Sequence, residues 1–316
     1  MGEERIYGMN TSIIHETSTS CIYQMDCDTT MGYMKCYHLF PGIDVAYTTF
    51  TASYCKMRNK ALPNILEIAY CYSGRFECKY KNDYFTYMGE GDFAVSVLSP
   101  EQEPAMFPIG NYEGIAIIID LEVAGRDFSV VEGIDIDFEI FKNKFCANHC
   151  CIVSRANIEL SHAFEAIYKL NGKKDEIGFI RLKVLEIFYL LTKIIPEEKI
   201  KVSNYYSRKQ IEKIKSLRND IVECLDSKET LKSMAHRYNM SLTSMKECFK
   251  DVYGKPIYTF RKEFKMQKAT QLLRETNYTI LEIAGQLGYE NPNKFSTAFK
   301  KVIGETPSEY RKQKNE

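Results

Sequence analysis

Residues 230–254 read TLKSMAHRYNMSLTSMKECFKDVYG, and residues 279–304 repeat the same pattern as TILEIAGQLGYENPNKFSTAFKKVIG. The first part of each copy has apolar residues at positions i, i+3, i+4 and i+7, which predicts a short helix with one core-facing stripe. A second stripe of similar spacing follows a few residues later. The stripe positions are Leu231, Met234, Ala235, Tyr238, Met245, Cys248, Phe249 and Val252 in the first copy, and Ile280, Ile283, Ala284, Leu287, Phe295, Ala298, Phe299 and Val302 in the second.

A short turn joins the two predicted helices of each copy. Ser241 and Asn291 open the second helix of each copy, and both residue types are favoured N-caps. Thr279 and Glu282 have the spacing of a capping box. Two short helices joined by such a turn form a helix-turn-helix unit, whose second helix enters the major groove of DNA. The repeat therefore predicts two DNA-binding units, at about 230–254 and 279–304.

Further helices are expected around this repeat, at 211–225, at 257–274 and from about Thr306-Pro307 onward. The second of these would be roughly 27 Å long at ~1.5 Å per residue. Since successive major grooves on one side of B-DNA lie about 34 Å apart, a helix of this length can hold both units toward the same face of the duplex.

Charge divides the chain into two parts of opposite sign. The whole chain carries 42 Lys and Arg against 42 Asp and Glu, but residues 207–316 carry 22 against 14. The rest therefore carries 20 (42 − 22) against 28 (42 − 14). A basic C-terminal part indicates a polyanion partner, although surplus Lys is also common on solvated helices.

The N-terminal half is expected to be rich in β-structure after a loose polar arm at residues 1–30. Short β-rich runs separated by turn residues are typical of a small barrel or jelly roll. The expected strands lie in 45–57, 65–74, 75–92 and 114–120, with turns at Ser73-Gly74, Asn82-Asp83 and Gly89–Asp92.

A barrel of this size can hold one small ligand. Aromatic residues are frequent in this half, and they either line such a cavity or fill the barrel core. The candidates for an effector pocket are Tyr47, Phe50, Tyr70, Tyr72, Phe76, Tyr80 and Phe93.

Metal-dependent catalysis is not expected. The GEGD stretch resembles the cupin superfamily, whose catalytic members usually bind a metal through clustered histidines. The five histidines of this chain stand apart in the sequence, at His15, His38, His149, His162 and His236. We therefore expect no catalytic residue, no metal site and no cofactor.

One cluster offers an alternative, because CANHCC (Cys146–Cys151) holds three thiols and an imidazole. Such a group could bind a soft metal or react with a thiol-reactive effector. The adjacent pair Cys150-Cys151 matches no common zinc pattern, so ordinary buried thiols are the competing interpretation.

The pattern becomes helical after Asn157, with one amphipathic helix and then a strongly apolar one from Ile177 to Ile194. The apolar surface of the second is wider than one stripe, which favours a homodimer through Asn157–Ile194 over burial within one subunit. Residues 197–206 are polar and aperiodic, as in a linker. Unpaired cysteine spacing and the lack of a long apolar run or signal-like start predict a reducing cytoplasmic location, away from the membrane.

Residues 281–312, LEIAGQLGYENPNKFSTAFKKVIGETPSEYRK, closely resemble the signature of the AraC/XylS family of bacterial transcription regulators. The first unit departs slightly, since Pro256 follows Gly254 by two residues whereas Pro307 follows Gly304 by three. The resemblance implies seven helices, two recognition helices in adjacent major grooves, and control of transcription through RNA polymerase. It also implies an N-terminal cupin-like domain for an effector and for dimerisation.

Residues off the apolar stripes are expected to face DNA. Lys can donate to guanine, Asn can pair with adenine, and Thr can contact the thymine methyl group. The expected base-reading residues are Thr243, Ser244, Lys246, Glu247, Asn293, Lys294, Ser296 and Thr297, of which the family motif favours Thr243, Lys246, Asn293 and Thr297. The expected phosphate contacts, which give affinity without sequence choice, are Ser241, Lys250, Lys255, Asn291, Lys300, Lys301 and Arg311.

The chain is therefore expected to be an α+β multidomain protein that is not an enzyme. A cupin-like β-barrel or jelly roll (1–155), a helical dimerisation segment (156–196) and a linker (197–206) would precede an all-α DNA-binding domain (207–316). The expected function is a ligand-responsive transcription activator with double-stranded DNA, RNA polymerase and a small-molecule effector as partners. The alternative is a DNA-binding protein whose N-terminal half is an enzyme or a thiol or metal sensor using Cys146–Cys151.

Overall fold

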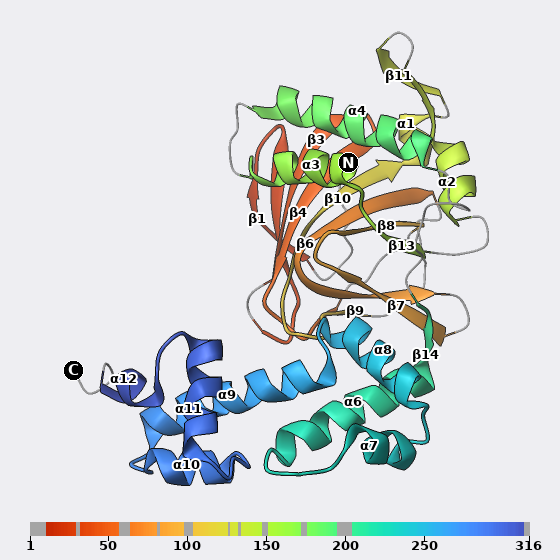
Figure 1. Cartoon of the computed structure of the whole chain (residues 1–316). Coiled ribbons are helices and arrows are strands. Elements are labelled where there is room, and N and C mark those ends of the chain that lie inside the picture. The colour runs from red at the N-terminus through yellow and green to blue at the C-terminus, as the bar shows by residue number, and fades with distance from the viewer. Residues whose placement is uncertain are drawn as a thin grey trace. The chain divides into compact units, whose positions relative to one another are not determined.

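A computed structural model of the chain describes residues 11–29, 32–56, 64–80, 83–97, 104–125, 127–131, 134–146, 151–171, 176–194 and 204–312. The chain divides into two compact units, Met1–Ser207 and Arg208–Glu316. Strands make up most of the first unit and helices make up the second (Figure 1). Among the described helices, none combines the length and the apolarity needed to cross a bilayer.

The first unit is a curled antiparallel sheet with helices on one face (Figure 1). The helices are α1 (Leu121–Ala124), α2 (Phe138–Cys146), α3 (Ile158–Tyr168) and α4 (Ile177–Lys193). The strands are β1 (Thr11–Glu16), β2 (Ser20–Met25), β3 (Gly32–Phe40), β4 (Ile43–Phe50), β5 (Tyr54–Cys55), β6 (Ile65–Tyr80), β7 (Tyr84–Gly89), β8 (Asp92–Val97), β9 (Ala105–Met106), β10 (Tyr112–Asp120), β11 (Asp127–Val131), β12 (Ile134–Asp137), β13 (Cys151–Arg155) and β14 (Tyr206–Ser207).

Strand β6 connects the parts of this sheet. Its first half pairs with β10 along one edge and with β8 along the other, and its second half pairs with β7. Gly74 lies between the two halves, with a φ of +86° that a side chain would strain. A Cβ at this position would also meet the backbone oxygen of Asn111 at 2.2 Å. Glycine therefore lets β6 bend while the neighbouring chain stays close.

Three features differ from the sequence-based expectations. Residues 11–16 and 20–25 form the paired strands β1 and β2, so the prediction of a loose arm over residues 1–30 is wrong there. Ser73-Gly74 is not a turn, because β6 continues through it. Helix α2 was not expected, and it buries Phe138, Phe141 and Phe145. The i, i+3, i+7 spacing of these phenylalanines is the sequence feature that indicates this helix.

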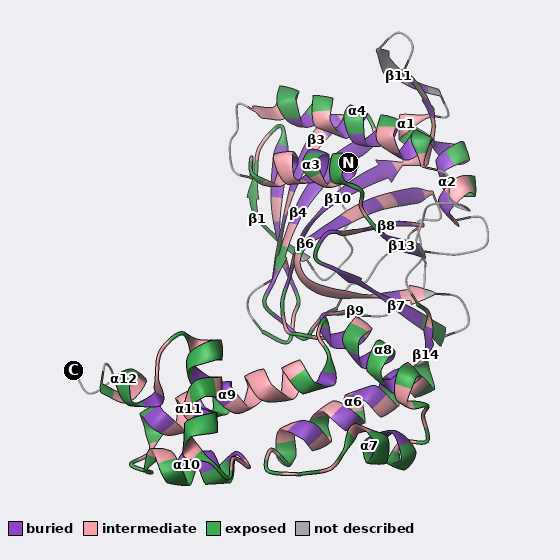
Figure 2. Ribbon diagram, viewed as in Figure 1, coloured by how far each residue is buried: buried purple, intermediate pink, exposed green. Residues whose placement is uncertain are grey.

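The two faces of the sheet belong to different cores. Most residues of the central strands are buried (Figure 2). Alternate residues of β6 such as Leu66, Ile68 and Tyr70 pack with α3 and α4 in one cluster. Cys71 and the alternate residues of neighbouring strands pack in a second cluster on the other face, which is the interior of the curl. The sheet thus separates a core that it shares with the helices from an interior core to which only strands and their connecting loops contribute.

The second unit consists of short helices around a long one, and its helices match the expected positions within a few residues. They are α6 (Arg208–Glu223), α7 (Leu231–Arg237), α8 (Leu242–Tyr253), α9 (Ile257–Glu275), α10 (Ile280–Gln286), α11 (Pro292–Ile303) and α12 (Pro307–Lys312).

Replacing Gly74 with alanine tests the bend in β6. We expect Gly74→Ala to destabilise the protein by about 2–4 kcal/mol, because the new Cβ meets backbone atoms as well as adopting a strained φ. Gly110→Ala is the matched control, since Gly110 also has a positive φ (+78°) but nothing lies within 4 Å of its Cβ position. Its cost should be about 1 kcal/mol. Equal unfolding free energies for the two variants in urea would contradict this account of β6.

Candidate nucleic-acid interface

The two helix pairs α7–α8 and α10–α11 have the same local geometry. Each first helix is followed, two residues after its end, by a residue with positive φ, Asn239 (48°) in one pair and Gly288 (74°) in the other. The next backbone N–H donates back into the first helix at 2.9 Å in both pairs, from Met240 to Ala235 and from Tyr289 to Ala284. The sequence repeat is therefore a structural repeat, down to the turn.

The caps of the second helices also correspond. The Ser241 hydroxyl oxygen accepts from the N–H of Ser244 at 3.1 Å at the start of α8. The Asn291 side-chain oxygen accepts from the N–H of Asn293 at 2.8 Å at the start of α11. Left-handed glycines, Gly254 and Gly304, end α8 and α11. The predicted N-caps and the capping box at Thr279 are confirmed.

An aromatic pair anchors each second helix. Phe249 of α8 meets Phe260 of α9 edge-to-face, with ring centroids 5.3 Å apart and planes at 76°. Phe299 of α11 meets Tyr310 of α12 at 5.7 Å, also at 76°. Edge-to-face contacts are a favoured aromatic geometry. These matching anchors leave the opposite faces of α8 and α11 toward solvent.

The polar faces of α8 and α11 hold the residues expected to read bases. Thr243, Lys246 and Glu247 are exposed on α8, and Ser244 is half-buried. On α11, Asn293, Lys294 and Thr297 are exposed and Ser296 is half-buried. The Thr297 hydroxyl donates to the Asn293 carbonyl oxygen at 2.9 Å, so its oxygen can still accept a hydrogen bond and its methyl group can make an apolar contact. The expected residues therefore lie together on solvent-facing helix surfaces.

A family model described as a helix-turn-helix domain matches residues 234–313. This segment is an AraC-type helix-turn-helix domain. The chain is 41% identical over 63 residues to the F1 operon positive regulatory protein of Yersinia pestis, which covers 20% of this chain and 21% of that protein. It is 28% identical over 101 residues to the HTH-type transcriptional activator RhaR of Mannheimia succiniciproducens, covering 32% and 37%.

A solved structure, the C-terminal domain of AraT, a response regulator from Geobacillus stearothermophilus, aligns with 33% identity and a TM-score of 0.31. The match covers 32% of this chain and 84% of that one. The chain spans between about a fifth and two fifths of the length of the two curated relatives above. The family model's match lies within the second unit, Arg208–Glu316.

The residues expected to contact phosphate fall into two groups in the AraC-type domain. Lys250, Lys300 and Lys301 are exposed, and Ser241 and Asn291 are helix caps with donor groups still available at the helix starts. The contacts of two others, Lys255 and Arg311, lie within the domain. The Lys255 ammonium lies 2.5 Å from a Glu263 carboxylate oxygen, and the Arg311 guanidinium donates to the Tyr278 carbonyl oxygen at 2.6 Å.

The net charge of the two recognition helices differs. Helix α11 (PNKFSTAFKKVI) contains Lys294, Lys300 and Lys301 and no acidic residue. Helix α8 (LTSMKECFKDVY) balances two lysines against Glu247 and Asp251. Because phosphate contacts dominate nonspecific affinity for DNA, α11 is the helix better suited to supply it.

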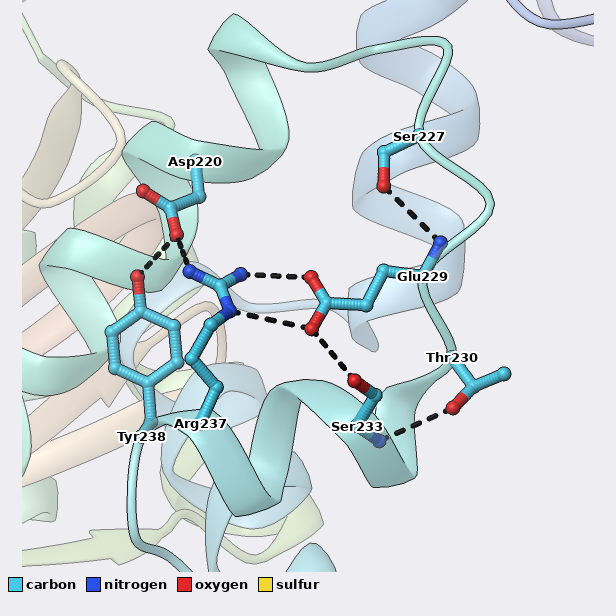
Figure 3. Close-up of polar contacts among 7 residues, drawn as sticks. All are labelled: Asp220, Ser227, Glu229, Thr230, Ser233, Arg237 and Tyr238. Atoms are coloured by element: carbon cyan, nitrogen blue, oxygen red, sulfur yellow. Dashed lines mark hydrogen bonds and ion pairs between the residues drawn. The ribbon is translucent and has the colours of Figure 1, made fainter.

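Polar contacts hold α7 against α6 in the first helix-turn-helix unit (Figure 3). The Arg237 guanidinium pairs with both oxygens of Glu229 and with Asp220, and the Tyr238 hydroxyl donates to the same Asp220 oxygen at 2.6 Å. These contacts hold the pKa of Asp220 and the pKa of Glu229 below their usual values, through hydrogen bonds from Tyr238 and Arg237 respectively. Sequence reasoning missed this network, since its members are spread over Asp220–Tyr238.

The residues predicted for the effector pocket lie on two different faces of the sheet. The Tyr47 hydroxyl donates to the Ile167 carbonyl oxygen at 2.9 Å, Tyr70 stacks on Phe164, and Tyr72 stacks on Tyr168. Those partners all belong to α3, and Phe93 is buried in the same helix-facing cluster.

Tyr47, Tyr70, Tyr72 and Phe93 therefore pack on the helix-facing side of the sheet and do not line the interior of the curl. Phe50 and Phe76 do face the interior, where both pack on Phe107. The side chain of Tyr80 lies outside the described residues. The physical reason is that β-strands with apolar residues on both faces give no signal for which face is inward.

The Cys146–Cys151 cluster is described only in part. Cys146 ends α2, and its thiol lies 3.8 Å from the Val95 carbonyl oxygen. Cys151 begins β13, while residues 147–150 lie outside the described part of the chain. Within the ranges that the structure describes, no three His, Cys, Asp or Glu side chains are placed to hold a metal ion.

Removing the Arg237 side-chain charge tests the network of Figure 3. We expect Arg237→Met to lower the free energy of unfolding by about 1 kcal/mol, the upper end for partly exposed pairs, because the contact is bidentate. The pKa values of the two carboxyl groups are depressed, so this contribution is present above their unfolded pKa values. It should shrink as the pH falls below about 4.

Lys228→Met is the control, because the Lys228–Glu290 pair has side chains 77% and 81% exposed. Solvent screening should leave this variant unchanged within error. A chemical denaturation series at pH 7 and pH 3 measures both variants. Equal effects of the two substitutions at pH 7 would rule out a special role for Arg237.

Proposed function

We propose that the protein is a sequence-specific, DNA-binding regulator of transcription. The observation that carries this proposal is the pair of helix-turn-helix units with matching turns, caps and aromatic anchors, each presenting a polar helix face to solvent. The named activities of the relatives, a positive regulatory protein and a transcriptional activator, agree with it. Activation through contact with RNA polymerase, in the cytoplasm, is the form of regulation that we propose.

In this proposal α8 and α11 enter successive major grooves of one duplex. Helix α9 has 19 residues and is therefore about 28 Å long. One helix-turn-helix unit packs on each end of α9. The length of α9 is close to the ~34 Å spacing of successive major grooves on one side of B-DNA. Two readers separated by about one turn of DNA can bind one uninterrupted site.

The proposal assigns different tasks to the residues on the recognition helices. Lys246 and Asn293 would donate to base edges, while Lys300 and Lys301 would contact phosphates. Losing a base contact should change sequence preference, whereas losing a phosphate contact should weaken binding to every sequence alike.

Gel retardation of a randomised promoter library by the full-length protein tests this division. We expect Asn293→Ala and Lys246→Ala each to lose about 1–3 kcal/mol of discrimination at one or two base positions. Lys300→Ala and Lys301→Ala should keep the preferred sequence and each reduce the salt dependence of log K by about 1.

Lys169→Ala, which removes an exposed lysine of the strand-rich unit, serves as the charge-matched control and should change neither property. If the wild-type protein retards no fragment at moderate salt, the proposed function fails. If the lysine variants alter sequence preference, the assignment of tasks fails.

The first unit is proposed to dimerise through α4. This helix buries one side in its own subunit and exposes Phe179, Leu182 and Tyr189 to the extent of 42%, 63% and 47%. These positions follow a spacing of i, i+3 and i+10, which places them along one stripe. Exposed apolar stripes of this kind mark contact surfaces.

Leu182→Asp tests the dimer, because a charge in the centre of the stripe would be buried without a partner. We expect this variant to be a monomer at concentrations where the wild-type protein is a dimer, as measured by sedimentation equilibrium. Leu281→Asp is the control, since Leu281 of α10 is equally exposed (64%) but lies in the other unit. A monomeric wild type, or identical behaviour of the two variants, would exclude this interface.

The first unit is further proposed to be a cupin-like domain that binds a small effector. Coupling to DNA binding then requires that the effector binds two arrangements of the protein with different affinity. The alternative is an enzyme or a thiol or metal sensor built on Cys146–Cys151, and the described contact of Cys146, with the Val95 carbonyl oxygen, does not favour it.

A further inference from the structure

A row of small side chains crosses the interior face of the curled sheet. Strand register places Cys36, Ala46, Ala116, Ala69 and Ala94 next to one another across β3, β4, β10, β6 and β8. The helix-facing row one residue along is Tyr37, Val45, Ile117, Ile68 and Val95. Four of these five side chains, Cys36, Ala46, Ala94 and Ala116, are buried in the packed interior cluster, whereas Ala69 keeps partial exposure. Because protein cores are close-packed, the exposure of Ala69 marks the part of the interior face that is less completely covered.

Glu67 lies in the next interior row, between Ile118 and Ser96. The Ser96 hydroxyl donates to a Glu67 carboxylate oxygen at 3.5 Å. Glu67, Ser96 and the neighbouring Ala69 are deeply placed in the sheet, yet each keeps partial solvent exposure. This combination is expected of side chains at an incompletely packed part of the interior face.

The Glu67 carboxyl group has no cationic partner. Among the described residues, no Lys, Arg or His side chain forms a hydrogen bond or ion pair with it. Burial raises the pKa of Glu67, with the Ser96 hydrogen bond as the only opposing influence. A carboxylate that is buried without a cation lowers the stability of the fold. A glutamate at this position is therefore not explained by packing alone.

A second polar group reaches toward the same face. The Tyr112 ring leans along β10 over Gly114, where a Cβ would meet its hydroxyl oxygen at 2.6 Å. The Tyr112 hydroxyl is buried and has a hydrogen bond with the Thr48 side chain. Gly114 therefore makes space for a hydroxyl group on the interior face of the sheet.

We propose that the space beside Glu67 binds a small molecule with one protonated amine and a compact apolar body. The ammonium group would donate to Glu67, and the apolar body would lie against Ala69. An anionic ligand would instead meet the carboxylate without a compensating cation, so the site should discriminate against acids. This inference rests on the proposed function, because it names the chemical class of the effector.

Thermal unfolding of the full-length protein with matched ligand series tests the inference. The series are butylamine and 2-phenylethylamine, the alcohols 1-butanol and 2-phenylethanol, and the acids butyrate and 3-phenylpropionate. A ligand that binds only the folded state raises the melting temperature by mass action. We expect at least one amine at millimolar concentration to raise it by about 2–5 °C, and its alcohol and acid counterparts to have little effect.

Two variants locate the effect. Glu67→Gln should raise the melting temperature of the ligand-free protein, by removing the desolvated charge, and should abolish the shift caused by the amine. Ala69→Leu should fill the space and abolish the shift while leaving the carboxyl group in place. Glu113→Gln is the control, since that carboxylate lies on the opposite face and accepts from Tyr168 at 2.5 Å; the amine shift should survive it.

The inference is overturned if no amine stabilises the wild type, if acids stabilise it as much as amines do, or if the shift survives Glu67→Gln. DNA retardation by the same preparation separates this outcome from a failure of the proposed function. DNA binding without an amine shift removes the inference alone. An amine shift without DNA binding keeps the ligand site and removes the proposed regulator.

Discussion

Helix α9 supplies buried side chains to both helix-turn-helix units, and the spacing of the two recognition helices depends on this sharing. Its first turns bring Phe260 against Phe249 of α8. Its later turns bring Met266 and Leu273 into the core that holds Phe295 of α11. Because an α-helix of this length is stiff, neither core can shift along α9 without breaking its own packing. The distance between the two readers is thus a property of one helix.

The strand-rich unit depends on a different constraint, the alternation of side chains across a sheet. One face is filled with large apolar residues that pack on α3 and α4, and it supplies the stability expected of a closely packed core. The other face carries a row of small side chains, which pack for most of its length with larger residues such as Phe50, Phe107 and Tyr112, and it also carries Glu67. The proposed ligand site and the helix-supported core would thus lie on opposite faces of the same strands.

The second unit was largely predictable because its signals are local. Helix stripes have a period of 3.6, caps lie within four residues of what they cap, and two copies of the pattern confirm each other. The Arg237 network was not predictable, because it depends on how α7 packs on α6. A single sequence states neither that packing nor the distance between Arg237 and Asp220.

The interior of the sheet was not predictable for a related reason. Strand β10 reads YEGIAIIID, which is apolar on both faces, so its sequence does not indicate which residues point inward. Large aromatic residues such as Tyr47 and Tyr70 suggested a pocket lining, whereas the structure uses them against α3. Within Ile65–Tyr70 (ILEIAY), the single charged residue Glu67 indicates the interior-facing positions of β6 better than the aromatic residues do. Aligning the alanines required strand register, which only the structure provides.

A second contact ties the two helix-turn-helix units together and limits how the domain can be regulated. The loop after α6 lies so close to the turn after α10 that a Cβ on Gly288 would meet Asp226 Cα at 2.9 Å. Beside it, the Lys265 ammonium of α9 lies 5.2 Å from the centre of the Tyr289 ring. With α9 and this junction both fixing the separation of α8 and α11, altering that separation would disrupt two sets of packed contacts. An effector bound in the strand-rich unit could change how the whole DNA-binding domain is presented to DNA without breaking these contacts. A change in the spacing of α8 and α11 would break them, so the first route costs less free energy.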